Sequence, residues 1–218
     1  MRVLLHAVLR LLLRVIFGAA PRQTIGDWPA IVVANHDTHL DVFLVFSLFP
    51  LWRVSRVRAV AAADYFGKGF LGVGAKLAFN TILVQRASGD PAAALEPVRE
   101  ALRAKCSLVI FPEGTRGEPG VLMPFKPGIG ALAEEFPDVP IYPVALVGAE
   151  RALPKGDPLP VPFNIEIRQL EKVYGRDLIG RHGAGARRAM AAELEARIRE
   201  GLKEGGRPSL EAPPEEGT

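Results

Sequence analysis

A histidine and an aspartate stand five positions apart directly after a short apolar run. His36 and Asp41 belong to residues 35–41, Asn-His-Asp-Thr-His-Leu-Asp, which follow an expected strand over residues 31–34. A neutral imidazole can take the proton of a hydroxyl group while its oxygen attacks an acyl thioester. A carboxylate on the other ring nitrogen fixes the tautomer and stabilises the imidazolium that forms. The pair predicts general-base catalysis, and capping of the following helix is the alternative interpretation.

The sequence places no serine nucleophile beside this base. None of its serines lies in a Gly-x-Ser-x-Gly turn between a strand and a helix. Thr38 is close to His36 in sequence, but we expect it to cap the helix or to form a local hydrogen bond. We therefore expect direct transfer between two bound substrates, without an acyl-enzyme.

A metal centre is the rival interpretation of the same segment. Four of its residues have side chains typical of a dinuclear hydrolase: His36, Asp37, His39 and Asp41. Such centres need further ligands from elsewhere in the chain, usually histidines. Only His6, on the expected N-terminal helix, and His182, in an expected glycine-rich loop, remain. We therefore expect no metal site.

Two more polar motifs follow apolar runs in the same way. Gln85-Arg86 follows an expected strand over residues 81–84, and residues 112–116, Pro-Glu-Gly-Thr-Arg, follow one over residues 107–111. Ligands of open α/β sheets bind outside the carboxyl ends of the strands. If these strands are parallel neighbours, all three motifs meet at one edge of the sheet.

The residue types at this edge suit an acceptor that carries a phosphate. Arg86 and Arg116 can each form paired hydrogen bonds to a phosphate group. Gly114, followed by Thr115, allows a ligand to approach the backbone closely. Glu113 would accept a hydrogen bond from a substrate hydroxyl or hold an arginine. Lys126 would add a positive charge, with a surface salt bridge as the alternative.

The elements that must position these residues alternate along the chain. This order predicts an α/β fold, a single domain with a central, mostly parallel β-sheet flanked by helices. The expected strands cover residues 31–34, 58–61, 81–84, 107–111, 141–147 and 164–170. The expected helices cover residues 42–51, 90–104, 128–136 and 186–202. Pro97 should kink or shorten the second helix.

Residues 1–20 predict an amphipathic helix at a membrane interface. Arg2, His6, Arg10 and Arg14 recur every four residues in an apolar segment, so they fall within an arc of about 120°. This pattern is typical of a helix that turns its arginines towards lipid headgroups. A signal peptide and a helix packed on the protein's own core are the alternatives. We expect a membrane-associated protein, peripheral or monotopic, on the cytoplasmic face.

Composition agrees with one domain at a membrane surface. The chain has 218 residues, 49% of them hydrophobic, but it lacks the uninterrupted apolar run of about 20 residues typical of a spanning helix. Its first 60 residues carry seven arginines against three acidic residues, which suits an anionic lipid surface. A single cysteine, Cys106, allows no disulfide within the chain. We expect an acyltransferase domain over residues 21–204, a disordered tail over residues 205–218, and no nucleic-acid partner.

Four motifs in order carry a resemblance to a known family. They are Asn-His-x₄-Asp at residues 35–41, an apolar stretch ending in arginine at 82–86, Phe-Pro-Glu-Gly-Thr-Arg at 111–116, and an apolar-Pro-apolar strand at 139–144. A Phe-Lys-x-Gly element at residues 125–128 lies between the last two. Their order and spacing resemble the glycerolipid acyltransferase family typified by bacterial 1-acyl-glycerol-3-phosphate acyltransferase.

The resemblance implies that an acyl group moves from acyl-CoA or acyl carrier protein, as co-substrate, to the 2-hydroxyl of lysophosphatidic acid, giving phosphatidic acid. It implies no cofactor. It also implies that His36 is the base, that Asp41 orients it, and that Arg86, Glu113 and Arg116 bind the acceptor.

The chain departs from the family pattern in ways that leave the acceptor open. The second motif often begins with glycine, where this chain has Asn80 or Thr81, and the first often has serine in place of Thr38. Glycerol-3-phosphate, another lysophospholipid or a lyso-ornithine lipid are alternative acceptors. A non-catalytic lipid-binding module is the alternative from a different functional class.

Overall fold

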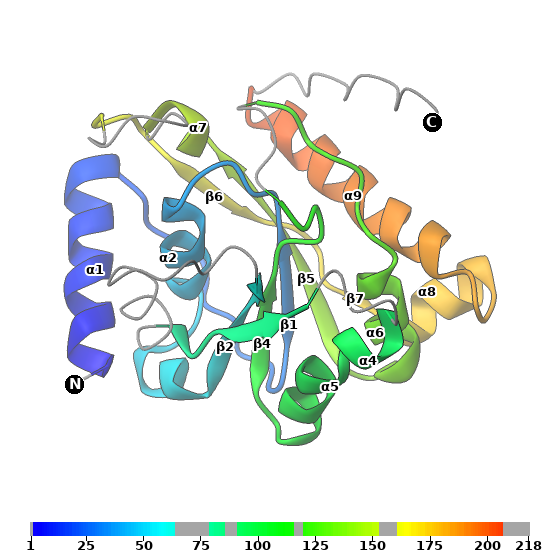
Figure 1. The fold of residues 1–218 in the computed structure, drawn as a ribbon. Coiled ribbons are helices and arrows are strands. Elements are labelled where there is room, and N and C mark those ends of the chain that lie inside the picture. Colours follow the sequence, from blue (N-terminus) through cyan, green and yellow to red (C-terminus); the bar gives the residue numbers. More distant parts are fainter. Residues whose placement is uncertain (1, 64–78, 86–90, 116–119, 153–160, 207–218) are drawn as a thin grey trace.

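The computed structural model describes residues 2–63, 79–85, 91–115, 120–152 and 161–206 (Figure 1). Within them, a mixed sheet has the order β3-β2-β4-β1-β5-β6, and β7 pairs with β5. The strands are β1 (Ile31–Ala34), β2 (Val57–Ala62), β3 (Ile82–Val84), β4 (Ser107–Ile110), β5 (Pro140–Val147), β6 (Glu166–Gln169) and β7 (Val173–Tyr174). Strands β1 to β5 are parallel, whereas β6 and β7 are antiparallel to β5. The predicted α/β domain with a mostly parallel sheet is confirmed.

Helices cover both faces of this sheet (Figure 1). They are α1 (Arg2–Phe17), α2 (Leu40–Phe46), α4 (Pro91–Ala94), α5 (Glu96–Arg103), α6 (Gly128–Glu135), α7 (Ala149–Ala152), α8 (Gly175–His182), α9 (Arg187–Glu204) and the 3₁₀ helix η1 (Leu51–Arg56). Successive residues of a strand point to opposite faces of the sheet. Val32 and Ala34 therefore pack in a core with α1 and α2, whereas Ile31 and Val33 pack in a second core with α5, α6, α8 and α9.

Strand β1 lies in the middle of the sheet, between β4 and β5. Val32 is the register partner of Val109 on one side and of Tyr142 on the other. All four residues of β1 and all four of β4 are buried. The carboxyl ends of these two parallel strands are therefore neighbours, and the polar segments that follow them meet at one edge of the sheet.

Two predicted helices differ from the observed ones near their ends. The helix expected over residues 42–51 is α2, which begins at Leu40, where the Thr38 hydroxyl accepts the Leu40 amide, and ends at Phe46. Past its end, the Ser47 hydroxyl donates to the Leu44 carbonyl. The helix expected over residues 90–104 is divided into α4 and α5, and Pro97 stands in the first turn of α5. The prediction that Pro97 shortens this helix is confirmed.

Strand β7 and helix α8 were not predicted, and His182 ends α8 rather than lying in a loop. The glycines in this segment make the helix difficult to predict from the sequence. A Cβ atom at Gly175 would lie 1.9 Å from the Ala133 carbonyl oxygen, so glycine is required where α8 packs on α6. Leu178 is the one fully buried large apolar residue of α8, and a single such residue does not give the helical periodicity by which a helix is recognised in a sequence.

Helix α1 forms as predicted, but its polar stripe does not all face outward: His6 and Arg10 face the protein, whereas Arg14 is exposed. His6 is buried against the protein, together with Leu13 and Phe17. The outward face is apolar, with Leu4 70% and Val15 73% exposed. Of the helices that the structure describes, none combines the length and the apolar character needed to cross a membrane. The predicted tail, residues 205–218, lies outside the described residues except for its first two.

Candidate active site

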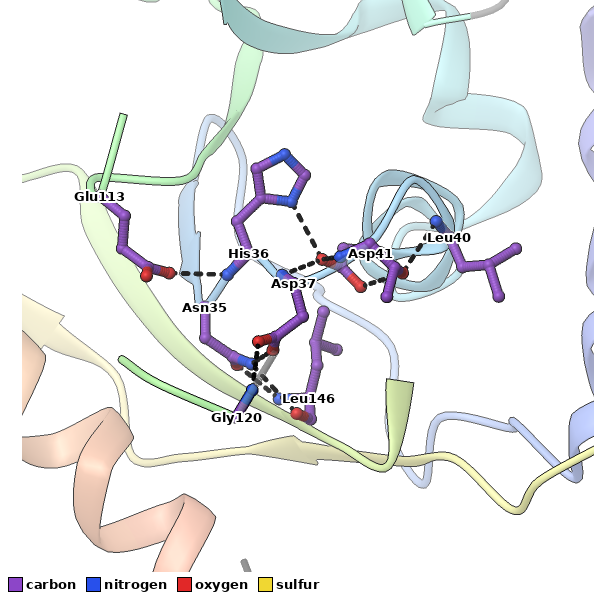
Figure 2. A network of polar contacts seen from close by, with 9 residues as sticks. Asn35, His36, Asp37, Leu40, Asp41, Glu113, Gly120 and Leu146 are labelled. Carbon is purple, nitrogen blue, oxygen red and sulfur yellow. Dashed lines mark hydrogen bonds and ion pairs between the residues drawn. The ribbon is translucent and has the colours of Figure 1, made fainter. Parts of the chain in front are cut away.

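His36 and Asp41 are hydrogen-bonded at the carboxyl end of β1. The loop after β1 carries His36, and the first turn of α2 carries Asp41. His36 Nδ1 lies 2.9 Å from Asp41 Oδ2, and the Asp41 side chain is 0% exposed (Figure 2). The other ring nitrogen, Nε2, points away from Asp41 (Figure 2). The structure therefore brings the two residues together as their spacing predicts, and the role of His36 as a base stays a prediction.

The Asp41 carboxylate is fixed by the loop that it closes. Its Oδ2 also accepts the backbone amides of Asp37 and Thr38, each at 2.7 Å. Its Oδ1 accepts the Thr38 hydroxyl at 2.9 Å. The local hydrogen bond expected of Thr38 is therefore confirmed, and four donors hold the carboxylate that orients His36.

Phe111 fixes the plane of the His36 ring. The two rings are stacked, with centroids 4.2 Å apart and an interplanar angle of 22°. Phe111 is the first residue after β4, so the neighbouring strand provides this support. A ring held by a hydrogen bond at its edge and a stacked ring on its face has little freedom to turn.

Glu113 lies behind the His36 loop, with a side chain that is 3% exposed. Its Oε1 accepts the His36 backbone amide at 2.7 Å (Figure 2). Its Oε2 accepts the Met123 amide at 2.9 Å. Burial, with smaller contributions from the Asp37 and Asp41 carboxylates, raises the pKa of Glu113 to about 8. These bonds favour a supporting role, and contact of Glu113 with the acceptor stays a prediction.

Asn35 and Asp37 belong to the same network, although no role in the expected acyl transfer was predicted for either of them from the sequence. Asn35 Oδ1 accepts the Leu146 amide at 2.8 Å, and its Nδ2 donates to the Leu146 carbonyl at 3.1 Å and to Asp37 Oδ2 at 2.9 Å. The Asn35 side chain thus extends the pairing of β1 with β5 by one step (Figure 2). Asp37 Oδ1 also accepts the Gly120 amide at 3.4 Å. The signal in the sequence is an asparagine directly after four apolar residues, because an amide buried at the end of a strand needs hydrogen-bond partners.

Gly114 and Lys126 are packed together beside this edge. Gly114 has a φ of 73°, and a Cβ atom added there would lie 3.0 Å from Lys126 Nζ. Thr115 is exposed on the same turn, and Lys126 is also exposed. Arg86 and Arg116 lie outside the described residues, so their expected contacts with phosphate stay predictions.

The described residues contain no group of three or more His, Cys, Asp or Glu side chains that could hold a metal ion. The two histidines outside the site have other surroundings. His6 stacks on Phe46 with ring centroids 5.3 Å apart, and His182 Nε2 lies 2.8 Å from Glu193 Oε2.

A small apolar pocket lies between the sheet and helices α5 and α6. Its volume is about 110 Å³, and its lining includes Val60, Val98, Ile110 and Leu132, with Pro112 and Lys126 near the carboxyl end of β4. Binding sites for small molecules usually enclose roughly 300–1,000 Å³. This pocket therefore does not define a site for an acyl chain.

Comparison with known proteins agrees with this geometry. A family model described as Acyltransferase matches residues 19–147, which is more than half of the chain. The chain belongs to the acyltransferase family. The match includes the His36–Asp41 pair and the segment that carries Glu113, and it confirms the family resemblance found in the sequence.

Several relatives of this acyltransferase-family chain have named activities. The 1-acyl-sn-glycerol-3-phosphate acyltransferase of Limnanthes douglasii is 36% identical over 152 residues, which cover 68% of this chain and 51% of that protein. The 1-acyl-sn-glycerol-3-phosphate acyltransferase alpha of Homo sapiens is 30% identical over 119 residues, covering 54% of this chain and 40% of that protein. The chain spans about half the length of the curated relatives it matches.

A solved structure shares the fold of this acyltransferase-family chain. It is the crystal structure of the 1-acyl-sn-glycerophosphate (LPA) acyltransferase PlsC from Thermotoga maritima. The TM-score is 0.63 at 22% sequence identity, covering 86% of this chain and 68% of that one. This likeness supports the architecture, whereas the family assignment rests on the sequence match.

Proposed function

We propose that this chain transfers an acyl group from acyl-CoA or acyl carrier protein to a hydroxyl group of a lysophospholipid, with 1-acyl-glycerol-3-phosphate as the first choice of acceptor. The observation that carries the proposal is the 2.9 Å contact between His36 Nδ1 and the buried Asp41 carboxylate. The named activities of the relatives support the choice of acceptor.

The geometry accounts for direct transfer. Asp41 holds the proton on His36 Nδ1, which leaves Nε2 as the base. Nε2 takes the proton of the acceptor hydroxyl as that oxygen bonds to the thioester carbonyl carbon. The tetrahedral intermediate then collapses, the carbon–sulfur bond breaks, and the imidazolium returns the proton to the leaving thiolate. The donor thus exchanges its acyl group for the proton of the acceptor, so no covalent acyl-enzyme is required.

Positive charge beside the dyad suits an acceptor that carries a phosphate. Lys126 is exposed at the edge of the sheet, and its side chain lies over Gly114, in the turn that follows β4. In the sequence, Arg86 directly follows Gln85 and Arg116 directly follows Thr115, the last described residues after β3 and β4. We assign these three cations to the phosphate of the acceptor, with Gly114 and Thr115 beside it.

We also propose that the outward face of α1 lies in a lipid interface. This face is an apolar surface formed by Val3, Leu4, Leu5, Val8, Leu11, Leu12, Val15 and Ile16. Trp52 of η1, which packs beside α1, is 70% exposed, and the Arg53 guanidinium lies 4.3 Å from its ring centroid. Tryptophan and arginine are typical of the headgroup region. The arginines of the first 60 residues, except the inward-facing Arg10, suit the anionic cytoplasmic leaflet.

The test uses purified protein in mixed micelles with lysophosphatidic acid and radiolabelled acyl-CoA, with His36→Ala as the matched control. Labelled phosphatidic acid from the wild type and not from the variant would support both the reaction and the base. Product from both proteins would refute the role of His36. No product in these conditions, with acyl carrier protein as donor, or with a panel of lysolipids would favour the lipid-binding module.

A further inference from the structure

Arg10 connects α1 to the C-terminal end of α2, the helix that carries Asp41 in its first turn. It lies on the inward face of α1, one turn after the buried His6. Its Nη2 donates to the carbonyl oxygen of Phe46 at 3.0 Å and also to that of Phe49. Phe46 is the last residue of α2, and Phe49 lies in the turn that follows it. One guanidinium therefore binds two carbonyl groups where α2 ends.

Burying the Arg10 guanidinium costs free energy, and the need to fill space between α1 and α2 does not explain why a charged side chain stands there. Burial lowers the pKa of Arg10, and its Nε is buried without a hydrogen-bond partner among the described residues. An apolar side chain of similar length would fill the same space without desolvating a charge. What only a cation supplies here is charge-assisted hydrogen bonding to the carbonyl groups at a helix C-terminus, where the helix dipole favours positive charge.

The opposite end of α2 holds the catalytic aspartate. The helix has seven residues, so it is about 10 Å long and forms a rigid element of about two turns between Arg10 and Asp41. Three aromatic contacts brace the same end of α2: His6 stacks on Phe46, and Phe79 meets Phe43 and Phe46 edge-on. A shift of α2 at this end would move Asp41, which in turn holds His36 Nδ1 and two amides of the His36 loop.

We propose that Arg10 is a positioning residue for the catalytic pair, acting through α2 on Asp41 and, through Asp41, on His36. The proposal rests on the acyl transfer proposed above for its kinetic consequence. It gives α1 a second role, because the same helix that carries the apolar outer face also sets the geometry of the base. The inner face and the outer face of α1 can then be separated by mutation.

The kinetic test compares Arg10→Met, Arg10→Lys and Arg14→Met in full-length protein. Arg10→Met keeps the length of the side chain and removes the donors, whereas Arg14→Met removes the same charge from an exposed position one turn later. We expect Arg10→Met to lower kcat on the order of ten- to a hundredfold, because small displacements of catalytic groups have effects of this size. The KM for the acceptor and the binding to anionic vesicles should stay unchanged. Arg10→Lys should recover part of the lost kcat, and Arg14→Met should keep the wild-type value.

A second measurement does not depend on any substrate. Amide hydrogen exchange over residues 37–46 reports directly on the hydrogen bonds around Asp41 and on α2. We expect faster exchange there in Arg10→Met and not in Arg14→Met. Unchanged exchange, or equal losses of kcat in both methionine variants, would overturn the proposal. Faster exchange in Arg10→Met together with a wild type inactive on lysophosphatidic acid would support the contact through α2 and instead refute the proposed acceptor.

Discussion

Replacing Glu113 by glutamine removes an ionisable group from behind His36 while keeping the size of the side chain. Both carboxyl oxygens of Glu113 accept backbone amides, from His36 at 2.7 Å and from Met123 at 2.9 Å. Glutamine has one oxygen, so one of these amides would face an NH₂ group instead. Leaving a buried amide without an acceptor costs about 1–3 kcal/mol of the free energy of unfolding.

Glu113→Gln should change how the free energy of unfolding depends on pH more than it changes that free energy at any one pH. The pKa of Glu113 is about 8 in the folded protein, against 4.5 for an ordinary glutamate. At about 1.4 kcal/mol per pH unit, this difference corresponds to roughly 5 kcal/mol. Because the folded state binds the Glu113 proton more tightly than the unfolded state does, protonation stabilises the fold, and this stabilisation is fully present below pH 4.5. It is lost as the pH rises towards 8. Glu113→Gln should therefore be less stable than wild type at pH 5 and should lose less stability between pH 5 and pH 8.5.

The assay is urea unfolding in detergent micelles at both pH values, followed by tryptophan fluorescence and circular dichroism. Glu100→Gln, an exposed glutamate of α5, is the matched control, and its pH dependence should equal that of the wild type. Equal slopes of stability against pH in wild type and Glu113→Gln would refute the argument that Glu113 is protonated in its buried site.

Two further predictions concern the base and the lipid surface. Asp41→Asn should lower kcat by about 10³–10⁴, because the amide keeps the shape but no longer stabilises the His36 imidazolium; the radiolabelled transfer assay measures this, and a loss below tenfold would contradict it. Val15→Glu should weaken binding to anionic vesicles about tenfold or more, because it removes the burial of one valine and adds a charge. In vesicle flotation, Ala192→Glu on the exposed side of α9 is the control, and equal binding by both variants would contradict the lipid-facing role of α1.

The strand ends were the part of the fold that the sequence predicted best. Four apolar residues before Asn-His, and three before Phe-Pro-Glu, indicate short buried strands followed by polar loops, and β1 and β4 agree with both. His36 and Asp41 were predictable because their spacing already implies a strand end and a first helical turn. Phe111 was part of a recognised motif, but its stacking on His36 depends on the pairing of β1 with β4, which no local pattern reveals.

The orientation of α1 was not predictable from its charge pattern. A period of four places the arginines on one face, but it does not state whether that face meets lipid or protein. His6 and Arg10 turn inward because α2 offers them aromatic rings and helix-end carbonyls, which are tertiary features. The roles of Asn35 and Asp37 likewise depend on Leu146 and Gly120, which are remote in sequence.

The position of β1 in the sheet has a consequence for biosynthesis. Its neighbours β4 and β5 begin at Ser107 and Pro140, so β1 has no neighbouring strand until about half of the chain has been made. Contacts between segments so distant in sequence form late in folding. Helix α1, with its apolar outer face, leaves the ribosome long before them. If the outer face of α1 binds lipid as proposed, attachment can therefore precede the pairing of β1 with β4 and β5, and the edge that carries His36 and Asp41 is then completed on a chain already at the membrane.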